Sequence, residues 1–161
     1  MTRWKRGGVT VVSLFREKGD ETAQAVVELP AAARVYDIRR RKDLGRTRRF
    51  ATRIVPGRAA FFAVLPSPGR IRLELEKDAA RRGEVVQAQV RVEGVSAPHP
   101  LHLRASAGKT DLEWLTRNIV AGAEAVRFPI PLAYNDPVGT YRIEVTDLFT
   151  GRTAVAGLTV R

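Results

Sequence analysis

The residues of this sequence with the clearest potential for chemistry are cations gathered between positions 39 and 53. They are Arg39, Arg40, Arg41, Lys42, Arg46, Arg48, Arg49 and Arg53. All fall in one expected β-hairpin, whose turn would project several guanidinium groups and whose strand would set Arg49 and Arg53 on one face. Because such a surface attracts polyanions, we predict a binding site for nucleic acid or an acidic polysaccharide.

The charge of the whole chain supports this prediction and also a simpler interpretation. The net charge is +11, and residues 1–67 hold 15 basic and 6 acidic groups. However, arginine outnumbers lysine by 23 to 5, a bias that coding composition alone can create, and hairpin tips are solvated. The nearby Tyr36, Phe50, Phe61 and Phe62 are expected in a core rather than stacked on bases. Polyanion binding and a merely solvated hairpin therefore both stay open.

The two tryptophans, Trp4 and Trp114, are the freer aromatic residues. A tryptophan ring packs well on the apolar face of a sugar, so both are candidate sugar-stacking residues of a carbohydrate-binding module. A tryptophan near a terminus, or one buried in a β-sandwich, is the commoner case. The sequence leaves this alternative open as well.

No grouping of residues predicts catalysis. His99 and His102 are the only histidines, and no serine lies in a Gly-x-Ser-x-Gly setting. The glycines form neither a phosphate-binding loop nor a dinucleotide fingerprint. Residues 135–139 offer oxygen ligands for calcium, but Asn, Asp, Pro and Gly in that order are also what a tight turn needs. We therefore expect a protein that is not an enzyme, with no catalytic residue, metal site or cofactor.

The elements that would position these residues are β-strands. Ile71, Leu73 and Leu75 alternate with charged residues, and residues 86–92 and 141–145 repeat the pattern, which is typical of strands with one wet face. Helix is expected only as a turn or two, at residues 21–27 or 111–117. The composition, 44 % hydrophobic and without cysteine, fits a folded protein without disulfides, and no apolar run is long enough to cross a bilayer.

A boundary is predicted at Leu65-Pro66-Ser67-Pro68-Gly69, because proline and glycine interrupt strand pairing. We expect two tandem antiparallel β-sandwich modules, 1–67 and 68–161, the second immunoglobulin-like. Strands are expected in the first at 9–15, 25–30, 34–38, 48–54 and 59–64. In the second they are expected at 71–76, 85–92, 101–105, 113–116, 125–131, 140–147 and 153–160.

Several stretches of both modules have a familiar pattern. In the first these are VYDI (35–38), LGRT (44–47), IVPG (54–57) and AFFAVLP (60–66). They resemble the C-terminal antiparallel β-domain that follows the barrel in many glycoside hydrolases. In the second, IPLAYNDPVGTY (130–141) and TDLFTG (146–151) resemble the last strands of macroglobulin-like or immunoglobulin-like modules of large bacterial secreted proteins.

The resemblance implies a non-catalytic accessory or interaction module, the C-terminal part of a larger carbohydrate-active protein, with the parent catalytic domain as its expected partner. A barrel of about 250 residues has no room in this chain. The resemblance also implies an extracytoplasmic location, although residues 1–6 are basic and lack the apolar segment of a signal peptide. Localisation and oligomeric state stay open.

Overall fold

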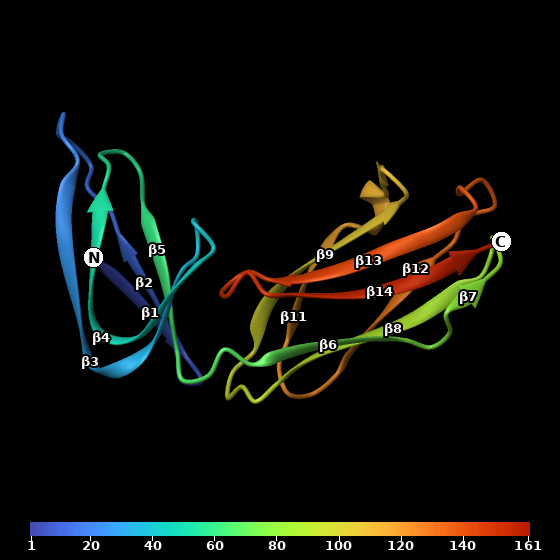
Figure 1. Ribbon diagram of the computed structural model, residues 1–161, viewed down its shortest axis with the longest axis horizontal. Coiled ribbons are helices and arrows are strands. Elements are labelled where there is room, and N and C mark those ends of the chain that lie inside the picture. The colour runs from blue at the N-terminus through green and yellow to red at the C-terminus, as the bar shows by residue number, and fades with distance from the viewer. The chain divides into compact units, whose positions relative to one another are not determined.

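The computed structural model describes residues 1–161 and shows an all-β protein, which confirms the predicted fold class (Figure 1). The chain forms two compact units. The N-terminal unit comprises Met1–Pro68, Val95–Ala97 and Phe149–Gly151, and the C-terminal unit comprises Gly69–Gly94, Pro98–Leu148 and Arg152–Arg161. No helix in the structure has the length and apolar character needed to span a bilayer.

The N-terminal unit is built on one antiparallel sheet of five strands in the order β1-β2-β5-β3-β4, so β1 and β4 are its edges. The strands are β1 (Thr2–Arg6), β2 (Val9–Leu14), β3 (Ala23–Asp37), β4 (Lys42–Ile54) and β5 (Ala60–Leu65). Two expected strands, 25–30 and 34–38, are parts of the single strand β3, and residues 21–27 form its beginning rather than a helical turn. Strand β1 was not expected.

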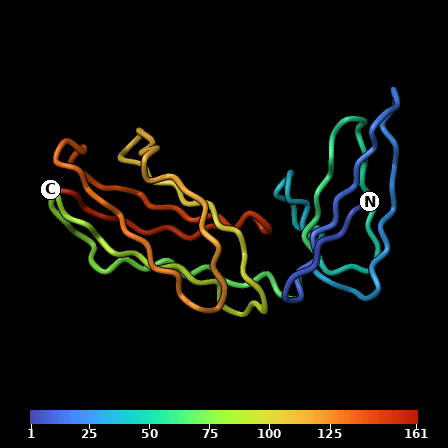
Figure 2. Tube along the Cα trace, turned by 180° about the vertical axis from the view of Figure 1, so that it is seen from behind, coloured from blue at the N-terminus to red at the C-terminus, as the bar shows by residue number.

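Strand β3 continues through Pro30 because a proline is tolerated where the ladder is already interrupted. Its pairing with β4 shifts register between Glu28 and Ala33 and again between Arg34 and Tyr36. Such bulges bend a strand. In Figures 1 and 2 the β3–β4 hairpin bends along its length before it reaches its turn.

The bend lets the sheet curl around its own core. Only the last part of β3, from Arg34 to Asp37, pairs with β5, while its first part pairs with β4 alone. Side chains from four strands then pack together, with the rings of Phe50 and Phe62 4.8 Å apart at their centroids. The cluster consists of Val12, Leu14, Val27, Leu29, Val35, Phe50 and Phe62. A second cluster holds the buried Tyr36.

The C-terminal unit has two sheets. One has the order β10-β9-β13-β14-β7, with β11 also paired to β9, and the other has the order β12-β8-β6. The strands are β6 (Arg70–Leu75), β7 (Ala79–Ala80), β8 (Val85–Glu93), β9 (His99–Ala107), β10 (Thr110–Asp111), β11 (Arg117–Ala121), β12 (Val126–Pro131), β13 (Gly139–Asp147) and β14 (Thr153–Val160). Only β7 pairs in parallel, with β14.

The two sheets enclose a core of alternating side chains. Along β8, Val86, Ala88, Val90 and Val92 are buried, and the residues between them face outward. On β13 the hydroxyl of the buried Tyr141 donates a hydrogen bond to the carbonyl of Pro137, 2.9 Å away. A tyrosine at the start of a strand, bonded to the backbone a few residues upstream, is a hallmark of immunoglobulin-like sandwiches. The predicted fold of this unit is confirmed.

One strand of the C-terminal unit was misplaced. Residues 113–116 were expected to form a strand, but Glu113–Leu115 form a 3₁₀ turn, inside the stretch where a helical turn was the other expectation. Leu112 and Leu115 are both buried, and a 3₁₀ turn places residues three apart on one side. The strand that pairs with β9 is β11, immediately downstream.

Candidate anion-binding site

All eight cations predicted for the basic hairpin are exposed on the N-terminal unit. Arg39, Arg40 and Arg41 lie in the turn between β3 and β4, and the other five lie on β4. The turn is held by Asp37, whose Oδ1 accepts a hydrogen bond from the backbone N–H of Arg40 at 3.0 Å. Because β4 is an edge strand, its cations also protect an unpaired backbone from pairing with other chains.

Three of the eight cations meet at one pocket of about 210 Å³. Arg39 and Arg40 come from the turn, Arg53 comes from the end of β4, and a fourth arginine, Arg58, comes from the loop before β5. The remaining lining residues are Asp37, Thr52, Val55, Ala59 and Ala60. We call this site the arginine pocket.

Arg58 was missed in the sequence because it stands apart from the basic run. A tight turn places Arg58 close to the end of β4, because its backbone N–H donates a hydrogen bond to the carbonyl of Val55 at 3.1 Å. Gly57, at the third position of this turn, has φ +72°, and Pro56 precedes it, which is the residue pattern of a type II turn. The Pro-Gly pair in the sequence was the signal that could have placed Arg58 beside the end of β4.

The arginine pocket holds more positive charge than its own carboxylate neutralises. Asp37, almost fully buried, lies 3.7 Å from the guanidinium of Arg40. The Arg39 guanidinium carbon lies 5.4 Å from the centroid of the Phe61 ring, a cation–π contact that orients this side chain. Arg53 and Arg58 form no ion pair. Four arginines and one carboxylate therefore line the pocket, and no carboxylate paired with Arg53 or Arg58 would compete with an incoming anion.

The other predicted cations do not line this pocket. Arg49 lies opposite Glu28 in the β3–β4 register, and Arg48 donates from Nε to the carbonyl of Leu29 at 3.3 Å. Arg46 lies directly opposite Arg34 and lines a different pocket. The single predicted patch is therefore divided along β4, although Arg49 and Arg53 do share the exposed face, as expected.

Arg34 is tied to Asp43 by hydrogen bonds of 2.9 and 3.2 Å. Burial raises the pKa of the Asp43 carboxyl, but the hydrogen bonds from Arg34 and from the backbone N–H of Gly45 outweigh burial, and the pKa lies below its usual value. The same side-chain bond is the main cause that raises the pKa of Arg34. This pair is already neutralised within the N-terminal unit.

The candidate sugar-stacking residues lie in separate units. Trp4 is on the edge strand β1 with 52 % of its surface exposed, and Trp114 is in the 3₁₀ turn of the C-terminal unit with 57 % exposed. A more exposed aromatic, missed in the sequence, is Tyr134 at 83 %, whose ring lies against the backbone of Gly83. Any side chain at Gly83 would collide with that ring.

The two histidines have different surroundings. His99 is buried with its Nδ1 2.9 Å from Oδ2 of Asp147, whereas Nδ1 of His102 lies 2.9 Å from Oδ1 of Asn118 near the surface. Three residues apart on β9, the two rings belong to opposite faces of the sheet. The Oδ2 of Asp136 accepts a hydrogen bond from the backbone N–H of Ala133 at 2.8 Å and closes a turn.

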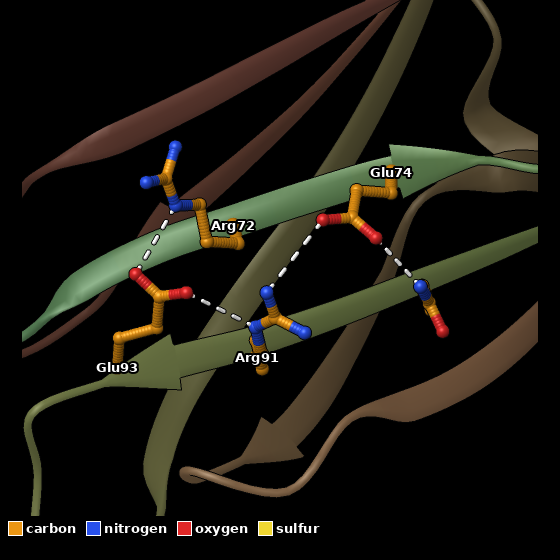
Figure 3. A network of polar contacts seen from close by, with 5 residues as sticks. Arg72, Glu74, Arg91 and Glu93 are labelled. Carbon is orange, nitrogen blue, oxygen red and sulfur yellow. Dashed lines mark hydrogen bonds and ion pairs between the residues drawn. The ribbon is translucent and has the colours of Figure 1, made fainter.

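Charges on the β6–β8 face of the C-terminal unit balance each other (Figure 3). Glu93 binds Arg72 at 3.1 Å and Arg91 at 3.2 Å, and Arg91 lies 3.8 Å from Glu74. The hydrogen bond from Arg72 is the largest cause that lowers the pKa of Glu93. Two arginines and two glutamates form this network, so the face offers no surplus charge comparable to that of the arginine pocket.

No protein-family model matches the chain, and no curated protein matches it either. Among solved structures, a β-glucosidase from Listeria innocua is 11 % identical with a TM-score of 0.38, over 58 % of this chain and 16 % of the enzyme. The sporulation control protein Spo0M of Bacillus subtilis is 18 % identical with a TM-score of 0.36, over 58 % of this chain and 49 % of that protein. A polysaccharide lyase is 13 % identical with a TM-score of 0.39, over 99 % of this chain and 25 % of the lyase.

Carbohydrate-active enzymes recur among these structures. The chain spans about a sixth of the β-glucosidase and a quarter of the lyase, 16 % and 25 % of their lengths. At such TM-scores and identities the similarity establishes neither a family nor an activity.

Proposed function

We propose that this protein is a non-catalytic binding module for an anionic polymer and that the arginine pocket is its contact site. The observation that carries the proposal is the convergence of Arg39, Arg40, Arg53 and Arg58 from separate segments on one pocket that contains a single carboxylate. Guanidinium groups bind carboxylate, sulfate and phosphate oxygens through paired hydrogen bonds. The exposed cations of β4 would extend the attraction along a polymer.

The test compares two anionic polymers, polygalacturonate and a 20-nucleotide single-stranded DNA, with neutral dextran. We expect an affinity for at least one of the anionic polymers that falls steeply between low and physiological salt, because binding releases counterions. The R53Q/R58Q double variant should bind at least about a hundredfold more weakly, since each lost charge-assisted hydrogen bond is worth about 1.5 kcal/mol or more.

The matched control is R3Q/R6Q, which removes the same charge from β1 of the same unit, outside the pocket. The affinity of R3Q/R6Q for the polymer should fall only by the long-range electrostatic attraction that two cations contribute. Equal losses in the two double variants would show that net charge alone drives binding and would overturn the site. Binding to dextran as tight as to the anionic polymers would overturn the proposal.

A finer version of the proposal is that the two units form an accessory part of a larger carbohydrate-active protein. The stretches at 35–38, 44–47 and 54–57 support it through their resemblance to a glycoside hydrolase β-domain. It predicts that the isolated chain releases no reducing ends from polygalacturonate or dextran. Retention in a neutral polysaccharide gel that is insensitive to salt and lost in W4A or W114A would instead favour a carbohydrate-binding module.

A further inference from the structure

A second pocket of the N-terminal unit, about 490 Å³, has a different character from the arginine pocket. Two cations, Arg34 and Arg46, lie at it, and most of its other lining is apolar. The apolar residues are Ala32, Ala33, Val64, Leu65, Pro66 and Pro68. Polar and apolar surface line it in about equal parts, which suits a small molecule that has a charged group and an apolar body. We call it the Arg34–Arg46 pocket.

The two arginines of this pocket lie directly opposite each other in the β3–β4 ladder. Like charges in directly opposed positions destabilise a sheet. Asp43 compensates Arg34 through hydrogen bonds of 2.9 and 3.2 Å, but Arg46 is exposed and forms no ion pair. The pair therefore retains one uncompensated positive charge beside an apolar surface, an arrangement that an anion with an apolar body would complement.

The backbone also sets this pair apart. The register between β3 and β4 shifts on both sides of Ala33 and Arg34. These two residues therefore pair with Thr47 and Arg46 as a short segment between two bulges. Bulges re-aim side chains and often lie next to functional sites. Three small residues in a row, Ala31 to Ala33, leave open space beside this short paired segment. Pro66 and Pro68, in the segment that follows β5, line the same pocket.

We propose that the Arg34–Arg46 pocket binds a small organic acid whose carboxylate meets the Arg46 guanidinium and whose apolar body packs on Ala32, Ala33 and Val64. A guanidinium accepts a carboxylate in a bidentate geometry. Packing against the concave surface of the pocket would remove the apolar part of the ligand from water. This site is independent of the proposed polymer site, because neither arginine lines the arginine pocket.

The experiment titrates the full chain with hexanoate, acetate and hexylamine while the methyl NMR signals of Ala32, Ala33 and Val64 are followed. Hexanoate should shift these signals in a saturable way. Acetate should bind at least about tenfold more weakly, because burying methylene groups contributes to affinity. Hexylamine, which has the apolar body with the opposite charge, should produce no saturable shift. Acetate binding as tightly as hexanoate would overturn the apolar half of the proposal.

Two variants probe the charge and the space separately. R46Q should weaken hexanoate about tenfold or more, and A32L, at an exposed position, should fill the pocket and weaken it without a change of charge. R49Q removes the same charge from the same strand outside the pocket and should bind as the unmodified chain does. Equal binding by R46Q and R49Q would overturn the proposal. R53Q/R58Q should bind hexanoate as the unmodified chain does, and this result distinguishes the test of this pocket from the test of the polymer site.

Discussion

The Nδ1 of His99 lies 2.9 Å from Oδ2 of Asp147, and both side chains are almost completely buried, at 0 % and 1 % exposure. The pair joins the beginning of β9 to the end of β13, two neighbouring strands of the larger sheet of the C-terminal unit. Removing one member of a buried polar pair deprives the other, which stays desolvated, of this interaction. The pair therefore links these two strands inside the C-terminal unit.

The first prediction concerns this pair. D147A should lower the free energy of unfolding by about 3 kcal/mol, within the range for breaking a buried polar pair. D147N keeps an oxygen that accepts a hydrogen bond and should cost less. Urea unfolding followed by tryptophan fluorescence measures both. H102A, which removes a histidine bonded near the surface, is the control, and a loss in D147A no larger than in H102A would contradict the structural role.

The second prediction concerns acid stability through Asp43. Its pKa is lowered in the folded protein from an ordinary value of 3.8, because the hydrogen bonds from Arg34 and Gly45 outweigh burial. A lowered pKa stabilises the folded state above the unfolded value, and that stabilisation is lost as the pH falls through the folded pKa. Urea midpoints between pH 6 and pH 2.5 should therefore fall less steeply in D43N than in the unmodified chain. Identical pH profiles would contradict this contribution.

The strands could be predicted where one face is buried and the other is wet. The alternation along β8 and β13 placed both strands, and the Phe50 and Phe62 core followed from the same pattern. Strand β1 carries no such pattern, because all five of its residues are exposed at a sheet edge. No local sequence pattern therefore identifies residues 2–6 as a strand.

The candidate site was predicted in part for the same reason. Local spacing set Arg49 and Arg53 on one face of β4, and it located the turn that carries Arg39 and Arg40. Local spacing could not predict that this turn lies beside Arg53 and Arg58, because their proximity depends on the bend of β3 at its bulges. The pairing of Arg34 with Arg46 depends on the same bulges, since a shift of one residue would move each side chain to the other face.

The third prediction concerns Tyr141. Y141F removes the hydrogen bond to the Pro137 carbonyl and should cost about 1 kcal/mol of unfolding free energy. Burial, with a smaller contribution from Asp136, raises the pKa of Tyr141 above its ordinary value of 10.0. A raised pKa gives stability that is complete below the unfolded value and is lost as the pH rises through the folded one. Unfolding midpoints from pH 8 to pH 11.5 should therefore fall less in Y141F, and parallel curves would contradict this.

The last prediction links the Pro56-Gly57 turn to binding. Gly57 has φ +72° and no atom near the position of a Cβ, so G57A should cost only the backbone strain of a left-handed residue, about 1 kcal/mol. It should also weaken binding of an anionic polymer, because the turn positions Arg58 at the arginine pocket. Gly45, at φ +80° and equally open, provides the matched control: G45A should lose similar stability and retain the affinity. If the two variants lose affinity equally, general destabilisation is the cause, and the placement of Arg58 by its turn does not contribute to binding.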